Sequence, residues 1–238
     1  MSRRVVSLAP SATSIIRTLG ETDRLVGMTD HDGRDTIGGW LTPDLDRVEE
    51  LDPELVITTD ALQAEIVGRL DERGIETVHF EPRTLDEAIE YIAGIGAAIG
   101  CPERGDELAT ATAKRIEGTR EIYAGSERPI VYCEEWGEPP MVAGNWVPEV
   151  VRAAGGRYPF LEPGERSKGI AYDVIRDASP DLGILHHCGR GDDIDPDLFD
   201  RRGWDIPQVH VIDDDLLNQP GPQLATAVET LGAYMHDR

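Results

Sequence analysis

The sequence repeats itself after about half its length, and this repeat restricts the fold more than any other feature. Residues 46–57 return 127 positions later as residues 173–184, and both copies place an aspartate seven positions before a proline. Two apolar runs return in the same order, 5–8 as 130–133 and 77–80 as 208–211. Alternating strands and helices alone make α/β chains look self-similar, but the shared aspartate-to-proline spacing is more specific. The repeat therefore predicts two similar halves.

Apolar strands that alternate with helices indicate the fold class of each half. Strands that are apolar on both faces are typical of a parallel sheet covered by helices on two sides. In the first half, strands are expected at 5–8, 25–28, 55–58 and 77–80, and helices at 10–19, 61–73 and 85–99. In the second half, strands are expected at 130–133, 182–184 and 208–211, with a helix at 147–154. The sequence therefore predicts an α/β protein with two parallel-sheet lobes.

One long helix is expected to join the lobes. Pro102 occupies a position that suits the first turn of a helix, apolar residues follow at helical spacing, and Pro129 comes after its end. The expected organisation is an N-terminal α/β lobe at 1–101, a linking helix at 102–125 and a C-terminal α/β lobe at 126–238. A single helix of roughly 30 Å makes a stiff link, which predicts small opening motions and a preformed cleft.

The loops that follow the predicted strands hold the candidate ligand-binding residues, because ligands of open α/β sheets bind beyond the carboxyl ends of the strands. Tryptophans on such loops offer a large, rigid surface to a flat or hydrophobic ligand, although each could instead cap a core. The candidates are Ser11, His31, Trp40, Glu135, Trp136, Asn145, Trp146, His187, Cys188 and Asn218.

Adjacent histidines and a cysteine follow one predicted strand and form the sharpest chemical feature. In an extended segment neighbouring side chains point to opposite sides, so His186 with Cys188, or His187 alone, is expected to face a ligand. His31 and His187 are the candidate metal ligands. Because the paired metal-binding spacings of histidine and cysteine are absent from the sequence, hydrogen bonding is the alternative role for both.

Signatures of common enzymes are missing. The sequence contains no nucleophile elbow, no phosphate-binding loop and no dinucleotide fingerprint, and Ser11 is interpreted as a helix N-cap. We therefore expect a binding protein that requires no cofactor. The enzymatic alternative is a metal chelatase or corrinoid-handling enzyme with His31, Glu135 and His187 as its working groups, and a scaffold for another protein is a third alternative.

The net charge of −23 limits the classes of partner that the protein can bind and the solvent conditions that suit it. A surface this acidic repels DNA, RNA and anionic lipid, so neither nucleic-acid binding nor membrane insertion is expected. The acids are interspersed with regular apolar residues, which favours a folded protein adapted to high salt over a disordered one.

Three widely spaced cysteines imply no disulfide framework. The start of the sequence is interpreted as a strand rather than a leader, which predicts a cytoplasmic protein, or an extracytoplasmic one if its native leader lies outside this sequence.

Five segments carry a resemblance to a known class of proteins. They are residues 4–13 (RVVSLAPSAT), 51–57 (LDPELVI), 135–141 (EWGEPPM), 143–149 (AGNWVPE) and 218–222 (NQPGP). They resemble the cobalamin-binding members, and in particular a short leaderless subgroup, of the ABC-importer binding proteins whose lobes are joined by a single backbone helix. The same class contains siderophore and haem binders.

The resemblance implies a corrinoid, such as cobalamin or another metal macrocycle, held between the lobes and linked to ABC-type import or corrinoid salvage. A ferric siderophore or haem is the alternative ligand, and the few basic residues in the loops argue against a strongly anionic siderophore. Asp46 and Asp173 stand where relatives carry the carboxylates that dock onto an ABC permease, although an aspartate near a helix N-terminus is favourable in any case. The chain departs from the subgroup at 30–35 and 187–189.

Overall fold

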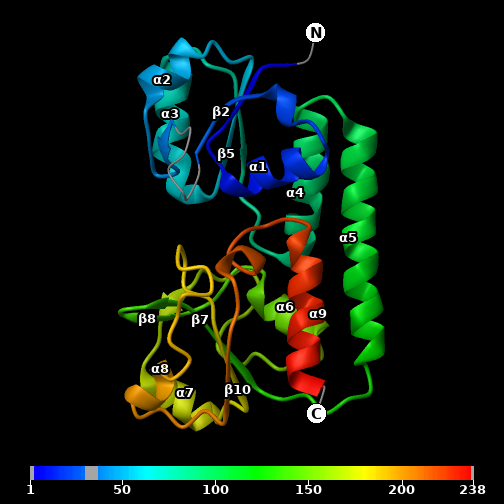
Figure 1. Cartoon of the computed structure of the whole chain (residues 1–238), viewed down its shortest axis with the longest axis vertical. Coiled ribbons are helices and arrows are strands. Elements are labelled where there is room, and N and C mark those ends of the chain that lie inside the picture. The colour runs from blue at the N-terminus through cyan, green and yellow to red at the C-terminus, as the bar shows by residue number, and fades with distance from the viewer. Residues whose placement is uncertain (1–2, 30–36, 237–238) are drawn as a thin grey trace. The chain divides into compact units, whose positions relative to one another are not determined.

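The computed structural model describes residues 3–29 and 37–236 and shows an α/β chain of two compact units. The first unit comprises residues 1–82 and 89–110, and the second comprises 83–88 and 111–238. Helix α5 (Pro102–Ile122) contributes to both units, since the division falls inside it (Figure 1). The predicted α/β fold class is confirmed.

The first unit is built on a four-stranded parallel sheet in the order β2-β1-β5-β6. Its strands are β1 (Val5–Ser7), β2 (Leu25–Met28), β5 (Leu55–Thr59) and β6 (Thr77–Phe80). All four coincide with predicted strands to within one residue. Their carboxyl ends therefore lie at one edge, as the parallel arrangement requires.

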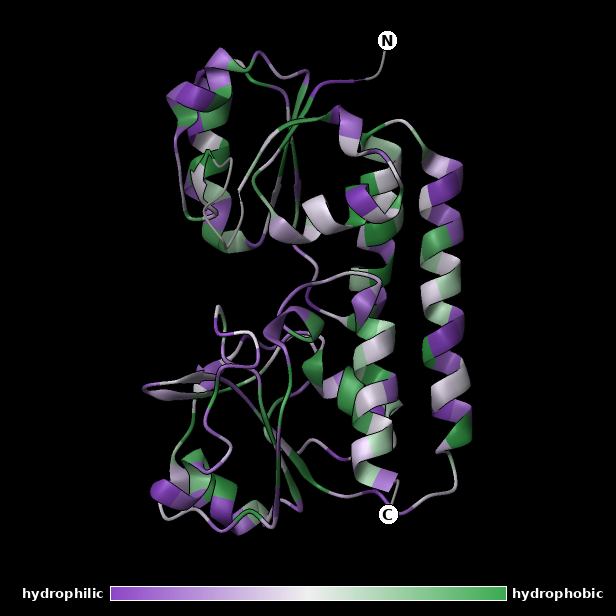
Figure 2. Ribbon diagram, viewed as in Figure 1, coloured by the Kyte–Doolittle hydropathy of each residue, from purple (hydrophilic) through white to green (hydrophobic). Residues whose placement is uncertain are grey.

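Alternate side chains of these strands fill two separate cores. Val5, Leu55 and Ile57 pack with the apolar faces of α1 (Pro10–Thr18) and α4 (Leu85–Ala98). Their neighbours in sequence form the second core with α2 (Leu45–Glu50) and α3 (Ala64–Glu72). Figure 2 shows the outcome: hydrophobic residues run along the central strands, whereas α2 is largely hydrophilic on its outer side. The sheet is thus covered on both faces, as expected.

The second unit contains a five-stranded sheet in the order β11-β10-β7-β8-β9. Strands β7 (Val131–Gly137), β10 (Leu182–Leu185) and β11 (Gln208–Val211) are parallel. Strands β8 (Pro140–Val142) and β9 (Lys168–Gly169) add an antiparallel edge that the sequence analysis did not predict. The helices of this unit are α6 (Val147–Ala153), α7 (Tyr172–Ala178), α8 (Leu198–Arg201) and α9 (Gln223–His236). Among them, α6 and α9 pack against each other (Figure 1).

The repeat is visible in matching hydrogen bonds at the start of a strand in each unit. The amide of Glu54 donates to Arg4 O at 2.9 Å, and the amide of Asp181 donates to Ile130 O at 2.8 Å. In return, Arg4 N donates to the Glu54 carboxylate and Ile130 N to the Asp181 carboxylate, both at 2.8 Å. The two halves thus share a local structure as well as a sequence pattern.

Several short elements complete the described chain. The predicted helix at 61–73 is a 3-10 turn, η2 (Ala61–Gln63), followed by α3, and two further 3-10 turns are η1 (Thr22–Arg24) and η3 (Asp214–Leu216). A hairpin of β3 (Gly38–Gly39) and β4 (Thr42–Pro43) precedes α2. Within the described residues, no helix combines the length and apolar character needed to cross a bilayer.

Candidate functional site

A pocket of about 540 Å³ lies at the carboxyl ends of β7 and β10 in the second unit. It lies among the turn between β7 and β8, the loop after β10, and helix α8. Three of the predicted ligand-binding residues, Trp136, His187 and Cys188, line it. The remaining lining residues are Gly137, Glu138, Arg190, Ile194, Asp195, Leu198, Arg201 and Arg202.

Trp136 supplies the main apolar surface of this pocket. Its side chain is 45% exposed, and its indole N–H donates to Glu138 O at 2.9 Å. This hydrogen bond fixes the indole against the β7–β8 turn and satisfies its only donor. The rest of the ring is free to contact an apolar ligand, together with Ile194 and Leu198.

A buried carboxylate organises the polar side of the pocket. Glu134 is fully buried and accepts hydrogen bonds from Tyr132 Oη at 3.0 Å, from His187 Nε2 at 2.9 Å and from Arg202 Nη1 at 2.8 Å. The Arg202 guanidinium compensates the carboxylate charge and stacks 5.0 Å from the centre of the Trp204 ring. A buried carboxylate with this many donors is held in one geometry.

The same network fixes the imidazole of His187. An ionised carboxylate only accepts hydrogen bonds, so the ring proton of neutral His187 is on Nε2 and its Nδ1 carries a lone pair. A Cβ at Gly137 would lie 2.7 Å from His187 Cε1, which means that the ring fits against the turn only because residue 137 is glycine. The ring of His187, which lines the pocket, is therefore held in one orientation.

The predicted alternation of side chains after β10 is wrong. His187 and Cys188 both line the pocket, whereas His186 is fully buried. The reason is that β10 ends at Leu185 and the chain turns at Cys188, so the two-residue period of a strand no longer applies.

His186 instead fixes Asn218. Its Nδ1 lies 2.5 Å from Asn218 Oδ1, and Asn218 Nδ2 donates to His186 O at 3.0 Å. Burial lowers the pKa of His186 to about 4, so its ring is neutral near pH 7. Among the described residues, its buried Nε2 has no hydrogen-bond partner. Asn218 thus has a structural role beside the pocket.

Cys188 lies on a loop that is anchored by Asp214. The amides of Gly189 and Gly191 each donate to the Asp214 carboxylate at 2.7 Å. Cys188 itself is exposed, but partial burial of its sulfur and the nearby Asp214 carboxylate raise the pKa of the thiol. The thiol is therefore protonated at neutral pH and weakly nucleophilic.

Three other predicted site residues of the second unit lie away from the lining of the pocket. Trp146 is 7% exposed, and its indole N–H donates to Leu217 O at 2.7 Å, so it belongs to the core. Asn145 forms the turn before α6 with a φ of 52°. Glu135 is half-buried and accepts from Ser167 Oγ at 2.5 Å.

In the first unit, the N-cap interpretation of Ser11 is wrong. Helix α1 begins at Pro10 with Ala9 as its N-cap, because proline already occupies the first helical position. Ser11 is buried in the first turn, and its hydroxyl pairs with Tyr91 Oη at 3.0 Å. Trp40 is half-buried at the turn of the β3–β4 hairpin. His31 lies outside the described residues.

The two candidate docking acids occupy equivalent places. Asp46 is the second residue of α2, and Asp173 is the second residue of α7. Their side chains are 84% and 73% exposed and pair with Arg73 Nη1 at 2.8 Å and with Arg176 Nη1 at 2.7 Å. Both carboxylates are therefore accessible to a partner on the surface of their own unit.

Helix α8 contributes residues to the pocket that were not predicted. Arg201 at the end of this four-residue helix and its C-cap Arg202 line the pocket, and Arg190 joins them from the preceding loop. A single turn leaves no periodic pattern to detect, and only the alternation of acids with arginines around it could have drawn attention. In the described part of the chain, no cluster of three or more His, Cys, Asp or Glu residues could hold a metal ion.

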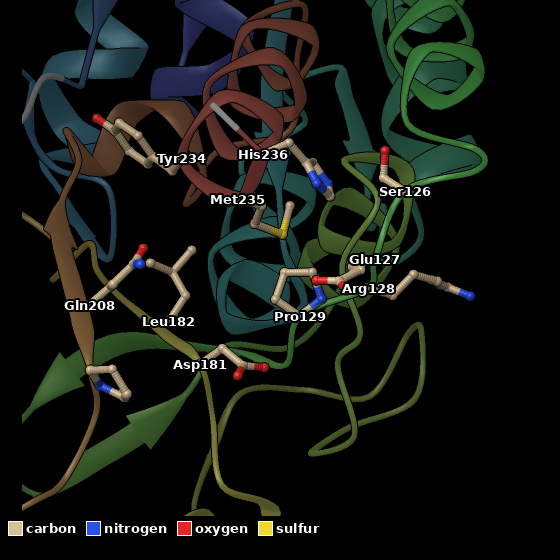
Figure 3. A pocket seen from close by; sticks show the side chains of 11 residues that line it. Ser126, Glu127, Arg128, Pro129, Asp181, Leu182, Gln208, Tyr234, Met235 and His236 are labelled. Atoms are coloured by element: carbon tan, nitrogen blue, oxygen red, sulfur yellow. The ribbon is translucent and has the colours of Figure 1, made fainter. Parts of the chain in front are cut away.

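A second hollow, of about 700 Å³, lies at the amino ends of β10 and β11 (Figure 3). Leu182 and Gln208 line it on one side, and Tyr234, Met235 and His236 of α9 line it on the other. Ligands of open α/β sheets bind at the opposite edge. We therefore take the smaller pocket, with Trp136 and His187, as the candidate site.

Comparison with curated proteins gives relatives that match most of this chain. The vitamin B12-binding protein of Vibrio cholerae is 24% identical over 254 aligned positions, which cover 98% of this chain and 89% of the relative. A cobalamin-binding protein of Halobacterium salinarum is 26% identical over 201 positions, covering 76% of this chain and 53% of the relative.

Solved structures share the fold over their whole length. The periplasmic vitamin B12-binding protein BtuF of Vibrio cholerae superposes with a TM-score of 0.78 at 21% identity, covering 98% of this chain and 96% of BtuF. The periplasmic haem-binding protein RhuT of Roseiflexus sp. RS-1 gives a TM-score of 0.80 at 23% identity, covering 100% and 99%. At this identity the likeness shows the fold alone.

The family itself is shown by a sequence profile. The profile described as periplasmic binding protein matches residues 5–230, nearly the whole chain. Its members bind small-molecule solutes and deliver them to ABC permeases without catalysis. The expectations of a solute-binding protein, of a permease partner and of no required cofactor are therefore confirmed. The chain belongs to the periplasmic binding protein family.

Proposed function

We propose that the protein binds a corrinoid for ABC-type import and works outside the cytoplasm, as its family does. The observation that carries this proposal is the pocket at the ends of β7 and β10, which is lined both by the exposed Trp136 and by His187, whose ring Glu134 holds in place. A corrinoid combines an apolar ring surface with hydrogen-bonding side chains at its rim. Trp136 suits the former and His187 the latter.

The relatives support this ligand. Relatives described as a vitamin B12-binding protein and a cobalamin-binding protein match 98% and 76% of this chain. His31, Trp40 and the other predicted residues of the first unit remain candidate contacts in this proposal. Trp146 and Asn218 form hydrogen bonds within the second unit, and with Asn145 they stay predicted contacts in this proposal.

Calorimetric titration with cyanocobalamin and with dicyanocobinamide tests the proposal. We expect a dissociation constant below about 1 µM for at least one of them, since import demands tight capture. Trp136→Ala should weaken binding by about tenfold or more, because it removes the main apolar surface. Ile122→Ala is the matched control, since Ile122 is 72% exposed on α5 away from the pocket. Absence of heat and of spectral change at tens of micromolar would exclude a corrinoid.

Haem is the second candidate, and the hydrogen bond between His187 Nε2 and the Glu134 carboxylate favours it. A histidine whose other nitrogen donates to a carboxylate is a typical metal ligand. Titration with haemin should then give a Soret band that His187→Ala shifts or removes. A corrinoid binder would show weak haem binding that is insensitive to this substitution.

We also propose that Asp46 and Asp173 contact the permease. Asp46→Arg and Asp173→Arg should leave ligand affinity within about twofold and lower permease-dependent uptake by about tenfold or more. Glu50→Arg and Asp177→Arg are matched controls, because both residues are exposed acids on the same helices. Equal losses in the test and control variants would show that only overall surface charge matters.

A further inference from the structure

A buried glutamine joins three segments at the carboxyl edge of the first sheet. Gln63, the last residue of η2, has no exposed surface. Its Oε1 accepts from Thr59 N at 2.8 Å, and its Nε2 donates to Leu8 O at 2.8 Å and to Trp40 O at 2.5 Å. A backbone amide can only donate and two carbonyls can only accept, so the orientation of the carboxamide is fixed by its partners.

The partners show what this side chain connects. Thr59 is the last residue of β5, and Leu8 follows the last residue of β1. Trp40 lies at the turn of the β3–β4 hairpin, whose strands have two residues each. So short a ladder gives the hairpin little stability of its own. The hydrogen bond from Gln63 therefore ties the turn of the hairpin to the ends of two central strands.

Exposed apolar residues are the sequence neighbours of the two residues that this hydrogen bond connects, Gln63 and Trp40. Leu41 is 45% exposed at the same turn, and Leu62, next to Gln63, is 57% exposed. With the half-buried ring of Trp40 they form what we call the Trp40 patch, defined as Trp40, Leu41 and Leu62. Large apolar side chains that stay exposed at the ligand-binding edge of an α/β sheet indicate a contact surface.

We propose that Gln63 is a positioning residue that holds the Trp40 patch in place to receive the apolar surface of the ligand. The identity of the ligand in this inference rests on the proposed function. The positioning of Trp40 by Gln63 rests only on the structure without ligand. Gln63 does not touch the ligand. It acts through Trp40, whose carbonyl it holds by a hydrogen bond.

Hydrogen–deuterium exchange on the ligand-free protein tests the positioning. Gln63→Met keeps the length and shape of the side chain but removes all three hydrogen bonds. We expect faster deuterium uptake in a peptide covering 37–44 and unchanged uptake in α4. Gln208→Met, at an exposed position in β11, is the matched control and should change neither. Unchanged uptake at 37–44 in Gln63→Met would overturn the proposal, whatever the ligand is.

A double-mutant cycle tests the functional consequence. We expect Gln63→Met and Trp40→Ala each to weaken cyanocobalamin binding by about tenfold, and the double variant to bind no more weakly than Trp40→Ala alone. Independent, multiplying losses would show that Gln63 does not act through Trp40. If the wild-type protein binds no corrinoid, the proposed function fails, while the exchange experiment still decides the role of Gln63.

Both the exchange experiment and the double-mutant cycle need a Gln63 variant that folds. If Gln63→Met does not fold, Gln63→Asn serves for both measurements, because it keeps a carboxamide but is one methylene too short to reach all three partners. It should show the same faster exchange at 37–44 and the same non-additivity with Trp40→Ala. Wild-type exchange and wild-type affinity in Gln63→Asn would overturn the proposal.

Discussion

Single buried polar residues determine the form of the candidate site. Glu134 balances the charge of Arg202 and orients His187, and Asp214 holds the loop that carries Cys188. Removing one member of a buried ion pair costs about 3–5 kcal/mol, since the other charge is left without compensation. Glu134 is therefore more important for the stability of the pocket than the exposed residues that line it.

His186 makes the stability of the protein depend on pH. Burial holds its pKa at about 4, whereas an unfolded chain has a histidine pKa of about 6.5. Between these values the unfolded state binds more protons, so the free energy of unfolding decreases as the pH falls. We expect thermal unfolding from pH 7 to 4.5 to show a loss on the order of 2 kcal/mol that His186→Gln lacks. Parallel curves for the two proteins would contradict this assignment.

How closely two helices approach each other depends on where a glycine, which has no side chain, stands between them. Helices α4 and α5 approach closely in the first unit, where a Cβ on Gly105 would lie 2.9 Å from Gly96 Cα. Gly118 lies farther along α5 and has open space around it. The same helix thus contains one glycine that packing requires and one that it does not.

These two glycines give opposite predictions. Gly105→Ala should lower the free energy of unfolding by about 1–3 kcal/mol, because the added methyl forces α4 and α5 apart. Gly118→Ala should raise it by about 0.5–1 kcal/mol, because alanine favours the helix and meets nothing. Chemical denaturation of both variants measures the effects. Destabilisation by Gly118→Ala would show an interaction of α5 that the structure does not explain.

Elements differ in how far their sequences reveal them. The strands at 25–28, 77–80 and 208–211 were predicted to the residue, because each is a run of strand-forming residues between turn residues. Strands β8 and β9 and helix α8 have two to four residues, and neighbouring segments rather than periodicity stabilise them. Within the site, Trp136 and His187 were predicted from their loops. Arg202 and Gln63 were not, because their roles depend on partners 68 and 55 positions away.

At the scale of the whole molecule, the excess of acidic over basic residues is the main influence on stability. The chain has 46 acidic and 23 basic residues, and most ion pairs of the described residues are exposed. Exposed pairs contribute little individually, so repulsion among the excess carboxylates is largely uncompensated at low salt. The prediction of a protein adapted to high salt rests on this charge balance.

Thermal unfolding at increasing KCl concentration tests that expectation. Screening weakens repulsion between carboxylates, so we expect the unfolding temperature to rise by about 5 °C or more between 0.1 M and 2 M salt. Titration with sucrose separates this effect from general exclusion of a solute from the surface. An unfolding temperature that falls with KCl would show that attractive surface pairs outweigh the repulsion.

The matching junctions at Arg4 and Ile130 have a consequence for recognition by another protein. Asp46 and Asp173 occupy matching positions in the two halves, each on the helix that leads into its junction. A partner that contacts both acids therefore meets the same local surface twice. A receptor with two-fold symmetry presents one binding element twice in the same way, so one contact, once evolved, serves both halves of this chain.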